Sequence, residues 1–175
     1  YEALFTLGDK PELKWDYALT ELNNLGFSST HEYLIYSMKQ VNEKFDLFPH
    51  ANPGLMSIEE IKDLKKYSPS GGVMIESFSK NIYEKGKAHY KTGTKYIDLR
   101  LETLKNAYEV KYPVTTGLLL GLTTTKEEIV DDISNLISLM SKNSAIQEVI
   151  LQNFRAKKNT LMRNSSEITN DLFLR

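Results

Sequence analysis

Short apolar runs alternate with amphipathic segments along this chain, and the pair recurs about every 30–35 residues, as in βα units. The runs do not alternate strictly between apolar and polar residues, so both faces of each strand are expected to be buried. Serial strand–helix units with buried strands predict an α/β fold with a parallel sheet and right-handed crossovers. An open doubly wound sheet and a barrel both satisfy this pattern. The predicted strands lie around residues 2–9, 45–54, 71–77, 114–122 and 146–154.

Helix starts are marked by a capping residue followed three positions later by a glutamate, which is the spacing of a capping box. A further helix is expected to begin at Ser166. Residues 78–98 are polar and weakly periodic, so much of this segment is expected to be a loop, and long loops in compact domains are often functional. The capping pairs are Asp9 and Glu12, Ser29 and Glu32, Ser57 and Glu60, and Thr125 and Glu128.

The composition is that of a globular domain and argues against several other classes of protein. Hydrophobic residues make up 41% of the chain and charged residues 26%, which are ordinary values for a globular domain. The net charge of −1 argues against a broad nucleic-acid-binding surface, and no apolar run approaches the ~20 residues of a membrane span. The absence of cysteine excludes disulfides and thiolate-bound metal within these residues and fits a reducing compartment. We therefore expect a cytoplasmic protein that binds neither nucleic acid nor membrane.

Both ends of the chain look cut, because a strand occupies the first residues and a helix start lies close to the last. We therefore expect residues 1–175 to form a single core domain that is truncated at both ends. A truncated sheet exposes a strand edge, so this piece by itself is expected to be poorly stable.

Polar residues follow the apolar strands at their carboxyl ends, where parallel α/β folds place their ligand sites. Glu76 stands out, because a carboxylate that ends a buried strand is costly unless it is paired or bound to a ligand. His50 and Asn52 can equally serve as turn residues, and Arg155 can form a surface ion pair or anchor an anion. The set comprises Thr6, Gly8, Asp9, His50, Asn52, Gly54, Glu76, Ser77, Gly121, Leu122, Thr123, Thr124, Gln152, Asn153 and Arg155.

Six segments occur in order along the chain: "EALFTLGDKPE", "FPHANPGLMS", "GVMIES", "GKAHYKTG", "VTTGLLLGL" and "IQEVILQNFRAK". Together they resemble the 7,8-didemethyl-8-hydroxy-5-deazariboflavin synthase family of radical S-adenosylmethionine enzymes. The resemblance runs through nearly the whole chain, and "PHANPG" followed by "QNFRAK" is its most specific part. It implies an α/β fold, a partial TIM-like (β/α) barrel of the radical S-adenosylmethionine type with parallel strands and outer helices.

The resemblance implies a lyase that forms the deazaflavin chromophore from a hydroxybenzyl adduct of ribitylaminouracil. The implied cofactors are S-adenosyl-L-methionine and a 4Fe-4S cluster, which together supply a 5′-deoxyadenosyl radical that abstracts hydrogen from the adduct. The cluster cysteines, in C-x-x-x-C-x-x-C spacing, are expected upstream of Tyr1 or are lost, so this piece alone is expected to be inactive. An electron-donor protein and the sister hydroxybenzyl transferase are the implied partners.

The resemblance also implies roles for the strand-end residues, although it assigns no catalytic residue and no metal ligand within this chain. Residues near the methionine amine, the ribose and the adenine of S-adenosylmethionine are expected to be Thr6, Gly8, Asp9, Glu76, Ser77, Gly117, Gly121 and Thr123. Residues that face the substrate are expected to be His50, Asn52, Gln152, Asn153 and Arg155. His50 and Asn153 are the best candidates for polar contacts to the uracil ring or the ribityl chain.

One departure from the family touches the expected cofactor site. Where the family often reads Gly-Ile-Gly-Glu-Thr, this chain has Gly121, Leu122 and then three threonines. Threonine does not readily adopt positive φ, and the lost glutamate removes a strong acceptor, so adenine binding is expected to be weaker or differently arranged. A sister radical S-adenosylmethionine enzyme, either the hydroxybenzyl transferase or a menaquinone-pathway relative, and a non-catalytic degenerate copy remain alternative interpretations.

Overall fold

The chain forms one curved, five-stranded parallel sheet in the computed structural model, which describes residues 1–122, 125–160 and 162–169. The strands follow one another in chain order across the sheet, as β1-β2-β3-β4-β5. This order is the simplest result of serial right-handed βα units. The strands are β1 (Glu2–Thr6), β2 (Phe48–Asn52), β3 (Ser70–Gly72), β4 (Val114–Leu120) and β5 (Ile146–Asn153).

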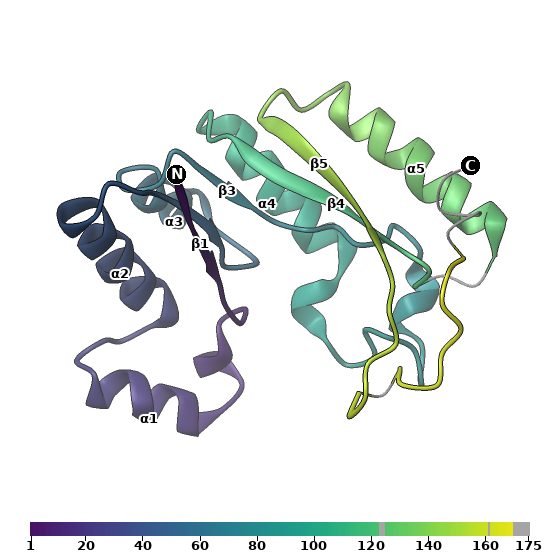
Figure 1. Ribbon diagram of the computed structural model, residues 1–175, viewed down its shortest axis with the longest axis horizontal. Helices are drawn as coiled ribbons and strands as arrows, with labels where there is room; N and C mark the ends of the chain where they lie inside the picture. Colours follow the sequence, from purple (N-terminus) through teal and green to yellow (C-terminus); the bar gives the residue numbers. More distant parts are fainter. Residues whose placement is uncertain (123–124, 161, 170–175) are drawn as a thin grey trace.

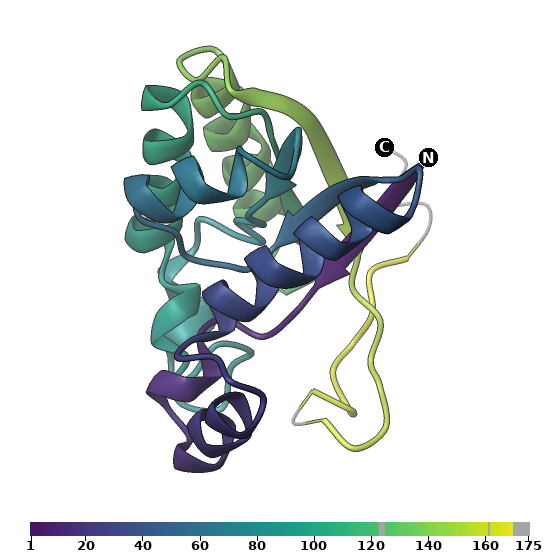
Figure 2. The same cartoon turned by 90° about the vertical axis from the view of Figure 1, so that its left-hand side faces the viewer.

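Helices cover one side of the sheet, and the side opposite carries no helix in the described part of the chain (Figures 1 and 2). The hydrophobic core lies between the sheet and the helices that cover it. Leu64 of α3, Leu104 of α4 and Val114 of β4 have no exposed surface there. No described helix has the length and apolar character that crossing a membrane would need. The helices are α1 (Asp16–Asn24), α2 (Thr30–Lys44), α3 (Ile58–Leu64), α4 (Ile97–Glu109) and α5 (Lys126–Met140), with short 3₁₀ turns η1 (Pro11–Leu13), η2 (Lys80–Tyr83) and η3 (Gly93–Lys95).

The strand between residues 71 and 77 differs from its prediction. Regular pairing of β3 ends at Gly72, although the Val73 N–H still donates to the Thr115 carbonyl oxygen of β4. After Met74 and Ile75, pairing with β4 resumes at a single bridge between Glu76 and Leu118. Glu76 itself has a φ of 69°, a left-handed conformation that is unusual for a residue with a side chain. The chain therefore leaves the sheet and returns to it just where the predicted carboxylate lies.

Three of the four predicted capping pairs are confirmed. The hydroxyls of Ser29, Ser57 and Thr125 accept hydrogen bonds from the third residue of α2, α3 and α5, respectively. At Ser57 and Thr125 the glutamate also reaches back to the capping residue, which completes the capping box.

The fourth pair is wrong, because tertiary contacts use its two side chains elsewhere. Asp9 accepts a hydrogen bond from the Leu55 backbone, and Glu12 accepts from the backbone and hydroxyl of Thr30. The segment after Asp9 forms η1, and α1 begins only at Asp16 without a side-chain cap. The helix predicted to begin at Ser166 is also not observed, because residues 166–169 are not helical and residues 170–175 lie outside the described part.

Thr125→Ala is expected to lower the free energy of unfolding by about 1 kcal/mol, because the first turn of α5 loses its capping acceptor. Thr125→Ser keeps the hydroxyl and should retain most of that stability. Urea denaturation of the two variants and the parent protein measures the difference. Equal stability of the alanine variant and the parent would contradict a contribution of this cap.

Candidate functional site

A cavity of about 1490 Å³ is lined by residues of all five strands and by Leu99 and Arg100 of α4. Its walls come from the strands and from the segments that leave their carboxyl ends, including residues 7–11, 13–15 and 91–95. The carboxyl ends of the strands gather at the lower edge of the sheet in Figure 1. The position is the one that parallel α/β folds use for ligands.

The strand register arranges the floor of this cavity in rows. One row joins Leu4 and His50, which line the cavity, to Ser70, the neighbour of His50 on β3. The next row begins with Thr6 and Asn52 and ends with Thr115 and Glu148 on β4 and β5. Layers of side chains contributed by successive strands are typical of barrel interiors. Side chains that are far apart in sequence therefore face one common space.

Two polar pairs are already formed in these rows. Nδ1 of His50 lies 2.8 Å from the hydroxyl oxygen of Ser70, and both residues are buried. The Thr115 hydroxyl donates to the Glu148 carboxylate at 2.9 Å. Hydrogen bonds of this kind fix the orientation of side chains before any ligand arrives.

Glu76 lies at the carboxyl end of the sheet and is held by two basic residues of the following loop. The His89 ring nitrogen Nε2 lies 2.7 Å from one carboxylate oxygen, and the Lys95 ammonium contacts the other. The His89 contact is a close approach rather than a well-aligned hydrogen bond. Burial raises the pKa of the Glu76 carboxyl, but the contacts with His89 and Lys95 outweigh burial and lower this pKa to about 2.

Arg100 of α4 contacts three separate segments of the cavity wall. Its guanidinium donates to the carbonyl oxygens of Met74 and Thr94, and it lies 3.9 Å from the Asp9 carboxylate. Burial raises the pKa of Asp9 above its ordinary value, and the hydrogen bond from Leu55 and the charge of Arg100 oppose this shift. One Asp9 oxygen, Oδ1, is buried without a hydrogen-bond partner in the described structure. A buried acceptor of this kind is available to a donor on a ligand.

Seven of the residues predicted for cofactor or substrate line this cavity together. They come from four different strand ends, which the sequence alone could not place side by side. The seven are Thr6, Gly8, Asp9, His50, Asn52, Glu76 and Gln152.

Five further predicted residues, all in the described part of the chain, lie outside the lining of the cavity. Ser77 is buried and accepts a hydrogen bond from the Ser79 backbone. Arg155 is half exposed and pairs with Glu167 at 3.0 Å, as the surface-pair interpretation predicts. Asn153 ends β5 with Oδ1 buried and unpartnered among the described residues.

Two glycines and one threonine complete the predicted set. Gly117 lies in β4, where the carbonyl oxygen of Ile150 comes so close that a Cβ atom would lie 1.9 Å from it. Gly121 follows β4 with a φ of 99°, a conformation that favours glycine. Thr123 lies outside the described residues. The proposed contacts of these residues with S-adenosylmethionine stay predictions.

Sequence reasoning missed several polar residues of the cavity. The lining also includes Lys95, Arg100, Thr115 and Glu148. His89 contacts the Glu76 carboxylate without lining the cavity itself. A signal existed for two of them, because His89 lies in the segment "GKAHYKTG" and Lys95 just beyond it, both within the long polar loop. Within the described residues, no group of three or more His, Cys, Asp or Glu side chains is arranged to hold a metal ion.

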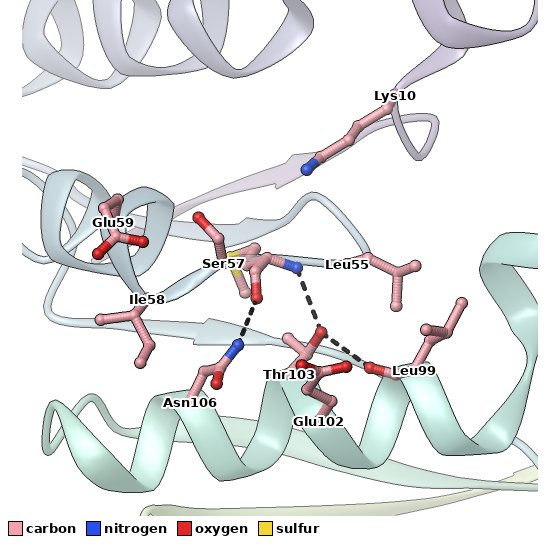
Figure 3. A pocket seen from close by; sticks show the side chains of 10 residues that line it. Lys10, Leu55, Ser57, Ile58, Glu59, Leu99, Glu102, Thr103 and Asn106 are labelled. Carbon is pink, nitrogen blue, oxygen red and sulfur yellow. Dashed lines mark hydrogen bonds between the residues drawn. The ribbon is translucent and has the colours of Figure 1, made fainter.

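A second, smaller cavity of about 390 Å³ lies between α4 and the loop that follows β2 (Figure 3). Thr103 and Asn106 of α4 hold this loop through the backbone N–H and carbonyl of Met56, at 3.2 Å and 3.0 Å. None of the residues predicted for ligand binding lines it. Its polar groups therefore anchor the loop that leads away from Asn52.

Comparison with curated proteins identifies relatives over nearly the whole chain, although no protein-family model matches. The 7,8-didemethyl-8-hydroxy-5-deazariboflavin synthase of Methanopyrus kandleri is 38% identical over 168 residues, which cover 96% of this chain and 50% of that protein. The FO synthase of Mycobacterium tuberculosis (strain H37Rv) is 43% identical over 162 residues, which cover 92% of this chain and 19% of that protein. The chain thus spans half, or less, of the length of these relatives.

Solved structures share the fold at low sequence identity. The FeFe-hydrogenase maturase HydG from Carboxydothermus hydrogenoformans matches with a TM-score of 0.70 and 19% identity, covering 97% of this chain and 37% of that one. Methylornithine synthase (PylB) matches with a TM-score of 0.64 and 19% identity, covering 79% of this chain and 38% of that one. These matches confirm the predicted fold, a partial barrel of parallel strands with outer helices. Over nearly its whole length, the chain is a homologue of part of the 7,8-didemethyl-8-hydroxy-5-deazariboflavin synthases.

Proposed function

We propose that this chain is the part of a deazaflavin-forming radical S-adenosylmethionine lyase that binds S-adenosylmethionine and the ribitylaminouracil adduct. The main observation in support of this proposal is the cavity at the carboxyl ends of the strands, which is lined by seven residues selected from the family resemblance. Relatives that carry the name deazariboflavin synthase match 96% of the chain, which supports the same assignment.

The end of the cavity near β1 suits the methionine part of S-adenosylmethionine. The unpartnered Oδ1 of Asp9 is an acceptor for the N–H of its amino group, and the backbone around Gly8 can come close because that residue has no Cβ. Glu76 is the proposed acceptor for the ribose hydroxyls. Because Lys95 and His89 already contact both of its oxygens, the ribose would have to share or replace one of these contacts.

The chemistry of the reaction comes from groups that this chain does not hold by itself. When bound and reduced, S-adenosylmethionine and a 4Fe-4S cluster supply the radical that abstracts hydrogen from the adduct. The chain has no cysteine, so the cluster thiolates would come from another part of the longer protein. The residues of the chain orient the two organic molecules and keep water away from them.

The floor of the cavity suits the substrate. Of the five predicted substrate contacts, His50, Asn52 and Gln152 line the cavity, and Thr115 and Glu148 add a hydroxyl and a carboxylate to the same surface. The proposed protein partners are an electron donor and the sister hydroxybenzyl transferase.

Product analysis of the longer protein that contains this chain tests the proposal. After anaerobic cluster reconstitution and reduction, it should release 5′-deoxyadenosine and convert the hydroxybenzyl–ribitylaminouracil adduct to the deazaflavin. If S-adenosylmethionine is not cleaved in a sample with a full complement of cluster, the proposed function fails and the non-catalytic alternative is favoured. Cleavage with turnover only of a different substrate would favour a sister enzyme.

Asp9→Asn is expected to weaken S-adenosylmethionine binding roughly tenfold or more, because a charge-assisted hydrogen bond becomes a neutral one. The amide can still accept from the Leu55 backbone, so the fold should be retained. Asp46→Asn is the matched control, since Asp46 is exposed and outside the cavity. Calorimetric titration gives the two dissociation constants, and equal values for Asp9→Asn and the control would remove Asp9 from the site.

A further inference from the structure

His50 and Ser70 form a hydrogen-bonded pair that the proposed function does not yet explain. They are direct register partners on β2 and β3, 20 residues apart in sequence, and Nδ1 of His50 lies 2.8 Å from the Ser70 hydroxyl oxygen. His50 is 8% exposed and Ser70 is 6% exposed. The ring is therefore held against the neighbouring strand rather than free to turn.

The direction of this hydrogen bond follows from the partners that each group has. Among the described residues, Nδ1 of His50 is the one hydrogen-bonding partner of the Ser70 hydroxyl. A buried hydroxyl proton without an acceptor is costly, so the Ser70 hydroxyl donates to Nδ1. Nδ1 must then be unprotonated, and the proton of the neutral imidazole resides on Nε2.

Nε2 of His50 has no hydrogen-bond partner among the described residues. It is also not fully buried, so a ligand in the cavity can reach it. His50 lines the large cavity, and its register neighbour on β1 is the apolar Leu4, which lines the cavity as well. An N–H beside an apolar surface favours a ligand that presents an acceptor on a flat, weakly polar group.

We infer that Ser70 is a positioning residue, which fixes His50 as the Nε2–H tautomer and makes it a hydrogen-bond donor to the ligand of this cavity. The ligand atom that meets Nε2 is then an acceptor, a carbonyl or hydroxyl oxygen. The identity of that ligand rests on the proposed function, under which the acceptor is a ring carbonyl oxygen of the ribitylaminouracil. The tautomer itself does not depend on the proposed function.

Nitrogen NMR of the longer protein, labelled with ¹⁵N-histidine, tests the tautomer. The His50 signals are assigned by their loss in His50→Gln. In the parent protein, we expect a pyridine-type signal from Nδ1 and a pyrrole-type signal from Nε2. A pyrrole-type signal from Nδ1, or from both nitrogens at neutral pH, would overturn the inference.

Two serine variants separate a positioning role from a structural one. Ser70→Ala removes the donor, so a mixture of tautomers is expected in place of one. Ser68→Ala is the matched control, because the Ser68 hydroxyl is also buried but donates to the carbonyls of Pro49 and Ser70 instead of His50. It should keep the parent His50 spectrum. An unchanged spectrum in Ser70→Ala, or an equal change in both variants, would contradict the assigned role.

Ligand selection provides the second test. Ribitylaminouracil presents ring carbonyl oxygens, and an analogue with a 2,4-diaminopyrimidine ring presents amino groups in their place. The parent protein should bind the carbonyl compound at least about tenfold more tightly, and this ratio should shrink in Ser70→Ala and persist in Ser68→Ala. Equal binding of the two compounds by the parent would overturn the assigned acceptor.

The two tests also separate this inference from the proposed function. A locked Nε2–H tautomer with carbonyl selection, but without cleavage of S-adenosylmethionine, would support the inference and reject the proposed reaction. Deazaflavin formation by a protein whose His50 carries its proton on Nδ1 would support the reaction and reject the inference.

Discussion

Gly117→Ala is expected to lower the free energy of unfolding by about 3 kcal/mol or more. An added Cβ would lie 1.9 Å from the carbonyl oxygen of Ile150 and 2.8 Å from its carbon, and both atoms belong to the backbone of β5. Because neither atom can turn away like the end of a flexible side chain, β4 and β5 must separate locally. The loss of parallel pairing in the longest ladder of the sheet then accounts for the cost.

Gly93→Ala is the matched control for this prediction. A Cβ at Gly93 would meet no atom within 4 Å, and this residue does not have a positive φ. Its free energy of unfolding should stay within about 0.5 kcal/mol of the parent value. Urea denaturation of the three proteins gives the comparison. Similar stability of the two alanine variants would mean that β5 does not approach Gly117 as closely as the structure shows.

Glu76→Gln is expected to remove about 3 kcal/mol of stability that the parent protein has at neutral pH. The Glu76 pKa of about 2 in the folded protein lies below its ordinary value of 4.5. A carboxyl whose folded pKa is depressed contributes its full stabilisation above the unfolded pKa and loses it as the pH falls through the folded pKa. The stability of the parent should therefore drop between about pH 4.5 and pH 2, and the variant should lack this part of the drop.

Glu84→Gln is the control for Glu76→Gln, because Glu84 lies in the same loop region and is exposed. Its unfolding free energy should follow the parent curve across the acid range. Denaturant unfolding at a series of pH values measures all three proteins. Parallel curves for Glu76→Gln and the parent would show that Lys95 and His89 do not stabilise the carboxylate in the folded state.

The Glu76 experiment also bears on the proposed ribose contact. A left-handed residue at the end of a buried strand is strained, and such strain is often retained at functional positions. The ion pairs with Lys95 and His89 give Glu76 a structural role in any case. A change in S-adenosylmethionine affinity in Glu76→Gln that exceeds its effect on the folded fraction would point to the additional role.

Much of the fold was predictable from the sequence because its signals are local. Apolar runs marked the five strands, and the hydroxyls of Ser57 and Thr125 marked helix starts by interactions within one helical turn. Parallel α/β folds bind ligands at the carboxyl ends of their strands, so the positions of the strands in the sequence were enough to select Asp9, His50 and Glu76. The same local signal failed at Asp9 and Glu12, because hydrogen bonds from Leu55 and Thr30 drew these side chains into tertiary contacts.

By itself, the sequence determined the α/β class, the order of strands and helices, and a set of polar residues at the strand ends. Tertiary structure alone decided which of these residues share one cavity and which partners they have. Glu76 contacts a lysine 19 positions away, and His50 contacts a serine 20 positions away. Such pairs depend on loop conformation and on strand register, which are fixed by packing of the whole sheet against its helices. No periodic pattern in the sequence indicates them.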